Sequence, residues 1–369
     1  MAGHLGHELR KLSIEVLERS FSIGITPDDF GITSGVPMLI VEVTTEALPD
    51  NVFDSIRRLP AVIIGVARSI RSLVGVPDES LQIYDVLLTE SDLPSAPWVQ
   101  CENIDATLDS LVASIDSSSG AAVALVQLLR YSSELELVDA IIAESFAYSM
   151  LQSGFRHQVW LRDKPTKPVK AFEESAVLIE REDGVLRIIL NRPEVHNAFG
   201  AQMRHDLVSA LELAKVDDSI SEVLFFGKGA SFCSGGDLDE FGYLDNPVTA
   251  HFIRTSSNAA VGMAAIAHKT RVFVHGACIG AGIELASFCA HITADAGAFF
   301  KLPEVSMGLI PGSGGTVSVR RRIGRQRTAF MSISGEPVGA DLAMRWGLID
   351  EISDFSANRL SEHKSVVES

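Results

Sequence analysis

The chain has 369 residues, which is more than one average domain needs and allows two. Its 48 acidic side chains outnumber its 31 lysine and arginine side chains, so the formal net charge is −17. This balance argues against nonspecific binding to nucleic acid or to an anionic membrane. No stretch resembles a signal peptide or a membrane span, so we expect a cytoplasmic protein with a small-molecule ligand.

The sequence pattern of residues 1–163 predicts an α/β domain. Apolar runs at 37–43, 61–66 and 83–88 have the length and composition of buried strands. A long helical pattern follows from about 117 to 151. These elements indicate a folded domain, which could also be an unrelated partner-binding module.

The next segment, 164–173, is charged, contains two prolines and lacks apolar periodicity, as an exposed linker does. Residues 174–352 then predict a second domain, the catalytic one. The last segment, 353–369, is polar and is expected to be a frayed tail.

Two glycine-rich turns in the second domain each have a glutamate close by, Glu284 after Gly280 and Gly282, and Glu304 before a turn at 312–315. Glycines let backbone N–H groups face a developing negative charge, and two carboxylates in an apolar pocket can hold different protonation states. The alternatives are simple: helix-dipole complementation by Glu284 and packing by the glycines. Nucleotide binding is disfavoured, because neither turn completes a dinucleotide or P-loop motif.

Four segments, 191–198 (NRPEVHNA), 231–238 (SFCSGGDL), 275–287 and 302–316, stand in the order and spacing typical of one family. They resemble the enoyl-CoA hydratase/isomerase (crotonase) superfamily, over about residues 174–352. The resemblance implies a crotonase-like spiral of ββα units. It also implies an acyl-CoA substrate whose thioester enolate is stabilised by two backbone N–H groups.

Carried over by resemblance, the oxyanion donors are the amides of Gly236 and Ala281, the second of which is commonly glycine in the family. Glu284 would deprotonate the water that attacks Cβ, and Glu304 would deliver a proton to Cα. The implied reaction is enoyl-CoA hydration. Double-bond isomerisation, hydrolysis or decarboxylation of an acyl-CoA remain open, as does a non-catalytic CoA-binding scaffold.

The resemblance also implies a larger set of substrate-binding positions. These are Arg192, His196, Asn197, Ala198, Gly235, Asp237, Leu238, Gly280, Pro311 and Gly312. His196 stands where the family usually has lysine or arginine, and histidine is charged only part of the time near neutral pH. A basic run, 320–322 with Arg325 and Arg327, could meet CoA phosphates or a neighbouring subunit, or could be a solvated helix face.

We expect no metal or separate cofactor, because no group of histidines, cysteines and carboxylates has metal-ligand spacing. The four cysteines are too scattered for a disulfide framework and predict reduced core residues. Cys233 and Cys278 lie beside the proposed oxyanion turns, yet neither has an evident base, so we expect no nucleophilic role for them.

The N-terminal domain carries two weaker resemblances to the same family. Segments 59–66 and 83–88 resemble the strand–loop–strand of the catalytic domain without its glycines and glutamate, which suggests a degenerate crotonase-like half. Crotonases usually continue into helices that close the pocket and build a trimer, and 121–160 resembles those helices. We therefore expect the N-terminal domain to supply them, in cis or to a neighbour, in a homotrimer or hexamer.

Overall fold

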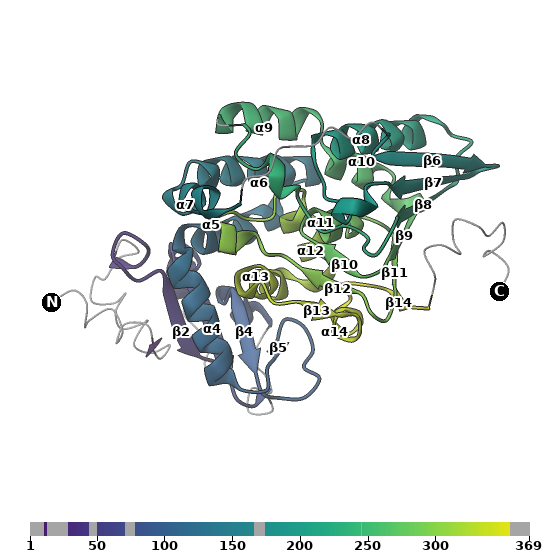
Figure 1. The fold of residues 1–369 in the computed structure, drawn as a ribbon. Helices are drawn as coiled ribbons and strands as arrows, with labels where there is room; N and C mark the ends of the chain where they lie inside the picture. The colour runs from purple at the N-terminus through teal and green to yellow at the C-terminus, as the bar shows by residue number, and fades with distance from the viewer. Residues whose placement is uncertain are drawn as a thin grey trace.

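The computed structural model describes residues 11–12, 29–43, 50–70, 78–165, 174–244 and 246–354 (Figure 1). We call the described residues up to 165 the N-terminal part and those from 174 the core part. Of the predicted linker, the structure describes only Lys164 and Pro165. The predicted tail lies outside the described residues from 355 onward.

The N-terminal part contains a five-stranded parallel sheet whose strands follow one another in chain order. Its strands are β1 (Lys11–Leu12), β2 (Met38–Glu42), β3 (Val62–Ala67), β4 (Val86–Thr89) and β5 (Val99–Gln100). Helix α3 (Asp50–Arg57) connects β2 to β3, and the 3₁₀ helix η3 (Asp78–Ile83) precedes β4. The three predicted apolar runs are therefore confirmed as strands.

Both faces of this sheet are buried, which explains its continuous apolar runs. Met38 and Ile40 of β2 join the large apolar cluster that also fills the core part, whereas Leu39 and Val41 face a separate cluster with Phe30. This alternation is the two-residue period of a strand. One face of the N-terminal sheet thus packs toward the core part, and the other has an apolar layer of its own.

Four helices follow the sheet: α4 (Ile104–Ser117), α5 (Ser119–Tyr131), α6 (Leu137–Gln152) and α7 (Phe155–Asp163), with η4 (Ser132–Glu134) after α5. The predicted helical stretch is therefore two helices with a break, and α4 was not predicted. Among the described residues no single helix is long and apolar enough to cross a membrane. The pair 104–117 and 119–134 meets the length and composition criteria together, but it is bent by 103°.

The core part is built on two sheets. The larger has the order β14-β11-β9-β8-β7-β6 and is parallel except for the β6–β7 hairpin. Its strands are β6 (Val177–Glu182), β7 (Val185–Leu190), β8 (Glu222–Gly227), β9 (Thr270–Val274), β11 (His291–Ala294) and β14 (Glu351–Ile352). The smaller sheet contains β10 (Ala277–Ile279), β12 (Phe299–Lys301) and β13 (Val338–Gly339).

Helices surround these sheets. They are α8 (Ala201–Val216), α9 (Pro247–Ser256), α10 (Ala259–Ala265), α11 (Ala281–Ala286), α12 (Gly315–Ile323), α13 (Arg325–Ser334) and α14 (Ala340–Trp346), with the 3₁₀ helices η5 (Pro193–Val195), η6 (Leu238–Glu240), η7 (Ala267–Lys269) and η8 (Glu304–Met307). Twice the chain passes from the larger sheet to the smaller sheet and then to a helix, as β9-β10-α11 and as β11-β12 followed by α12. This is the predicted spiral of ββα units.

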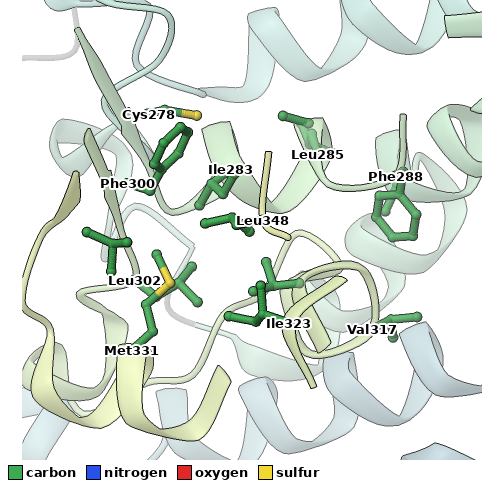
Figure 2. Packing of buried hydrophobic residues seen from close by; sticks show 14 of the residues in the cluster. Cys278, Ile283, Leu285, Phe288, Phe300, Leu302, Val317, Ile323, Met331 and Leu348 are labelled. Atoms are coloured by element: carbon green, nitrogen blue, oxygen red, sulfur yellow. The ribbon is translucent and has the colours of Figure 1, made fainter. Parts of the chain in front are cut away.

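Figure 2 shows the apolar layer that holds α11 in place. Cys278 and Phe300, from the smaller sheet, are fully buried beside Ile283 of α11, and Leu302 and Met331 continue the layer. Removal of such side chains leaves cavities that a close-packed interior fills poorly. The helix that carries Glu284 is therefore anchored by its apolar face.

A buried ion cluster joins the N-terminal part to the core part. Asp85, which is fully buried directly before β4, accepts hydrogen bonds from the backbone N–H of Ile63 at 2.8 Å and from Arg130 of α5. It also accepts a hydrogen bond from Arg325 of α13 at 2.8 Å. Buried charges need this kind of pairing.

Three further residues of the basic run are also engaged, whereas Arg321 is exposed. Arg327 donates to the carbonyls of Trp98 and Pro94, at 3.1 Å and 3.2 Å. Arg320 donates to the carbonyl of Ser132 at 3.2 Å, and Arg322 pairs with Asp350. The expectation of a solvated helix face is therefore wrong, because most of these guanidinium groups hold one part of the chain against another.

In Figure 1, α6 lies beside α9, at the boundary between the N-terminal and core parts. It packs against α5 and α12, and α7 packs against η8. These contacts bring helices from before the linker directly onto the elements that carry Glu304 and the turn at 312–315.

Candidate active site

Glu284 lies in the first turn of α11, as the sequence predicted. The helix begins after Gly280, whose φ of +49° suits glycine, and the Glu284 side chain is almost completely buried. Its Oε2 accepts hydrogen bonds from the backbone N–H groups of Ser313 and Gly315, at 2.7 Å and 2.9 Å. The second glycine-rich turn therefore holds this carboxylate in one orientation.

Glu304 is the first residue of η8, directly after Pro303. Its Oε2 is buried, and no hydrogen-bond partner for it exists among the residues that the structure describes. A Cβ atom on Gly280 would lie 2.5 Å from Glu304 Oε1, so this carboxyl group is packed against the turn that begins α11. A buried polar atom without a partner is rare in native proteins and calls for an explanation, of which a catalytic role is one.

Burial governs the ionisation of both glutamates. It raises the pKa of Glu304 to about 8, and it raises the pKa of Glu284 well above its usual value, with further contributions from the carboxylates of Glu304 and Glu144. The amides of Ser313 and Gly315 favour the ionised form of Glu284, whereas Glu304 Oε2 has no such donor. Burial therefore favours the neutral form of both carboxyl groups, and the two backbone amides oppose this effect at Glu284.

The two turns that carry the predicted oxyanion donors run side by side. Ile279 N–H donates to the Cys233 carbonyl at 2.9 Å, and a Cβ on Gly280 would lie 3.5 Å from the Gly235 Cα. In the described part of the chain, the N–H groups of Gly236 and Ala281 donate to no protein oxygen. Ala281 begins α11 without a positive φ, so an alanine is accommodated here.

Arg192 and Asp237, two predicted substrate-binding residues, pair with each other. Arg192 Nη1 donates to Asp237 Oδ2 at 2.8 Å and to the Ala198 carbonyl at 3.2 Å. Asp237 also accepts from the N–H of Asp239 at the start of η6. This ion pair shapes the turn that contains Gly236, and a contact of these residues with CoA stays a prediction.

Asn197 has a structural role that sequence reasoning missed. Its side chain is fully buried, its φ is +55°, and its Nδ2 donates to the carbonyls of Lys228, Ser231 and Phe232. Its Oδ1 accepts from the Arg192 N–H at 2.8 Å. Asparagine is among the residues that tolerate this left-handed conformation. Only the backbone of Asn197 is left for a substrate contact.

The remaining predicted positions lie around the same turns. His196 is exposed, with Nδ1 3.1 Å from the Ser231 hydroxyl, and Leu238 is 45% exposed at the start of η6. Pro311 is buried, and the Cα of Gly312 faces the ring of Tyr148, which a Cβ would approach to 2.5 Å. Their roles toward substrate stay predictions.

Neither buried cysteine of the site is suited to be a nucleophile. Burial raises the pKa of Cys233 to about 12 and raises the pKa of Cys278 well above its usual value. Within the described ranges, no group of three or more histidines, cysteines and carboxylates could hold a metal ion.

Sequence reasoning missed one carboxylate at the site. Glu144 of α6 accepts hydrogen bonds from the N–H groups of Gly314 and Thr316 at 2.7 Å and 3.0 Å, and from the Thr316 hydroxyl at 2.6 Å. The available signal was an acidic residue in the middle of the apolar helix α6, beyond Asp139 of its first turn. A buried carboxylate needs partners, and here they lie on the turn before α12.

Replacement of Gly315 by alanine should disturb Glu284 directly. The new Cβ would lie 2.6 Å from Glu284 Cγ and 2.8 Å from its Oε2, so the carboxylate must move. Because a displacement of about 1 Å can cost about 10²-fold in rate, we expect kcat for the acyl-CoA reaction to fall by that order. Steady-state kinetics of Gly315→Ala test this, with Gly339→Ala as the control, since a Cβ on Gly339 meets nothing within 4 Å. Equal kinetics of the two variants would contradict the prediction.

Stability should depend on pH through Glu304. Its pKa is raised from 4.5 in the unfolded chain to about 8 in the folded one, so unfolding releases a proton between these values. The contribution of the neutral carboxyl is complete below pH 4.5 and is lost as the pH rises toward about 8. In Glu304→Gln this stability is not lost as the pH rises. The difference between the thermal midpoints, variant minus wild type, should therefore increase with pH from 4.5 to about 8. A constant difference between the two proteins would contradict this expectation.

Comparisons with known proteins place the core part in a family. The family described as enoyl-CoA hydratase/isomerase matches residues 180–367. A 2,3-dehydroadipyl-CoA hydratase of Escherichia coli is 34% identical over 178 residues, which are 48% of this chain and 69% of that protein. A probable enoyl-CoA hydratase of Mycobacterium bovis is 32% identical over 48% of this chain and 68% of its own length. A solved structure from Mycobacterium abscessus, described as a putative enoyl-CoA hydratase/isomerase, is 31% identical over 51% of this chain and 74% of that one, with a TM-score of 0.47. On the family match and the two relatives, this chain belongs to the enoyl-CoA hydratase/isomerase family and is expected to act on acyl-CoA thioesters.

Proposed function

We propose that the protein is an enoyl-CoA hydratase that adds water across the α,β double bond of an acyl-CoA thioester. The observation that carries this proposal is the buried pair of glutamates. Glu284 is fixed by two backbone amides, and Glu304 keeps a buried oxygen without a partner in the described part of the chain. Water addition needs one group to take a proton and another to give one.

In the proposed mechanism the thioester oxygen accepts hydrogen bonds from the N–H groups of Gly236 and Ala281. Ionised Glu284 takes a proton from the water while the oxygen of that water bonds to Cβ. The electrons of the double bond move toward the thioester oxygen, which gives an enolate. The enolate then takes a proton at Cα from neutral Glu304. Donors that are already in place stabilise such an oxyanion without reorganisation.

The N-terminal part is proposed to close the pocket of its own chain. The packing of α6 against α9 and α12, and of α7 against η8, supports this assignment. The acyl-CoA carries all the chemistry that the scheme requires, so we propose no separate cofactor. A homotrimer or hexamer stays part of the proposal by analogy with the family.

The test is the loss of enoyl-thioester absorbance when the purified protein meets a short and a long trans-2-enoyl-CoA. Hydration predicts rapid loss with at least one substrate and a 3-hydroxyacyl-CoA product that mass spectrometry identifies. Glu336→Gln, which changes an exposed glutamate, should behave as the wild type does. CoA binding without loss of absorbance would reject hydration in favour of another acyl-CoA reaction or a scaffold.

A further inference from the structure

We propose that Glu144, supplied by helix α6 from before the linker, is a positioning residue for Glu284. In this arrangement Glu144 fixes the turn at 312–316, and that turn fixes the Glu284 carboxylate. The expected effect of Glu144 on catalysis rests on the proposed hydration. The expected effect of Glu144 on the turn at 312–316 is independent of that proposal and can be measured without any substrate.

The hydrogen bonds of the turn alternate between two carboxylates. The N–H groups of Ser313 and Gly315 donate to Glu284, at 2.7 Å and 2.9 Å. Those of Gly314 and Thr316 donate to Glu144, at 2.7 Å and 3.0 Å. Four successive amides are therefore shared between an acid of α11 and an acid of α6. The turn cannot release Glu144 without moving the amides that hold Glu284.

Contacts of the α6 residues that follow Glu144 support its position. One turn further along α6, the ring of Tyr148 packs against Gly312, where a Cβ would come within 2.5 Å of it. The Arg254 guanidinium of α9 lies 4.5 Å above this ring, and its Nε donates to the Ser145 hydroxyl at 3.1 Å. The turn is thus contacted by α6 at Gly312, Gly314 and Thr316.

The chemistry of Glu144 suits positioning better than simple packing. The side chain is only 2% exposed, and burial raises its pKa to about 7. The charged or titratable groups around it are Tyr148 on its own helix, Glu284 on α11, Glu304 on η8 and Arg254 on α9. Burial of a carboxylate is costly, so an apolar residue would serve packing alone better.

Glutamine cannot replace Glu144 in this role. One carboxylate oxygen accepts from Gly314, and the other accepts from the amide and hydroxyl of Thr316. An amide side chain has only one acceptor oxygen, so its NH₂ group would face a backbone N–H. Glu144→Gln keeps the size of the side chain but leaves one donor of the turn unpaired.

The experiment compares Glu144→Gln with Asp139→Asn, which makes the same chemical change at an exposed position of α6. Hydrogen–deuterium exchange of the peptide containing 312–316 should be faster in Glu144→Gln than in the wild type and unchanged in Asp139→Asn. In the same preparations kcat for enoyl-CoA hydration should fall by up to roughly 10²-fold while KM stays near the wild-type value. Thr316→Val, which removes only the hydroxyl donor, should shift both measurements in the same direction by less.

The outcomes distinguish the effect of Glu144 on the turn, its effect on Glu284 and the proposed function. Unchanged exchange and unchanged kcat in folded Glu144→Gln would overturn the proposal. Faster exchange with unchanged kcat, in an active enzyme, would overturn the link to Glu284. If the wild type hydrates no enoyl-CoA, faster exchange at 312–316 would still support the positioning of the turn, whereas the proposed function would fail. If Glu144→Gln does not fold, Thr316→Val carries the same comparison.

Discussion

Replacement of Glu304 by glutamine is expected to lower kcat for hydration of a trans-2-enoyl-CoA by roughly 10²- to 10⁴-fold. The amide has nearly the same shape as the carboxyl group but cannot deliver a proton to Cα. Because the proposed oxyanion donors, the N–H groups of Gly236 and Ala281, are untouched, KM should change little. Measurement of kcat and KM for both proteins across neutral pH tests this expectation.

A companion variant, Glu284→Ala, separates hydration from isomerisation. Loss of the group that takes a proton from water should abolish hydration, whereas a double-bond isomerisation that relies on Glu304 alone would persist. Circular dichroism of each variant establishes that the fold is retained. Near-wild-type hydration by either variant would contradict the assigned roles of the two glutamates.

Replacement of Asp85 by alanine is expected to lower the free energy of unfolding by about 3–5 kcal/mol. The variant leaves the buried guanidinium of Arg130 without its carboxylate, and it removes the carboxylate partner of Arg325, which keeps two backbone carbonyl acceptors. The N–H of Ile63 also loses its partner. Urea unfolding followed by circular dichroism gives the difference, provided that the transition is two-state.

The matched control is Glu134→Ala, which removes an exposed partner of Arg57. Exposed pairs contribute about 0–1 kcal/mol, so this variant should unfold close to the wild type. If Asp85→Ala proved as stable as Glu134→Ala, the cluster would not be what secures the N-terminal part to the core part. Exchange of amides in α5 and α13 would then show whether other contacts do so.

The sequence allowed the core part to be predicted because its information is local. The segment around Gly280 combines a turn, a helix start and Glu284 within a few residues, and the segment around Glu304 does the same for its turn. These local motifs carried the family resemblance, and the resemblance implied the ββα spiral and the roles of the two glutamates. The strands of the N-terminal sheet were predictable for a similar reason, since sheets buried on both faces have continuous apolar runs.

The missed features depend on contacts between distant residues. Glu144 lies 170 residues before its partner Gly314, and Arg325 lies 240 residues after Asp85. No local pattern distinguishes a buried arginine that binds backbone carbonyls from an exposed one, which is why the basic run was misjudged. The interpretation of the N-terminal part as a degenerate crotonase-like half stays a prediction. The described residues of the N-terminal part form one sheet, whereas the core part has two.

The order of the segments along the chain has a consequence during synthesis. Helix α6 leaves the ribosome 170 residues before the amide of Gly314 that Glu144 will bind. At about 5–20 residues per second, this interval lasts roughly ten to thirty seconds. Throughout that time α6 lacks α12, and for the first part of it α6 also lacks α9, so its apolar side chains are not fully covered. The nascent chain should therefore engage chaperones over this helix, and translation pauses between α6 and α12 should lower the yield of folded protein more than pauses after α13.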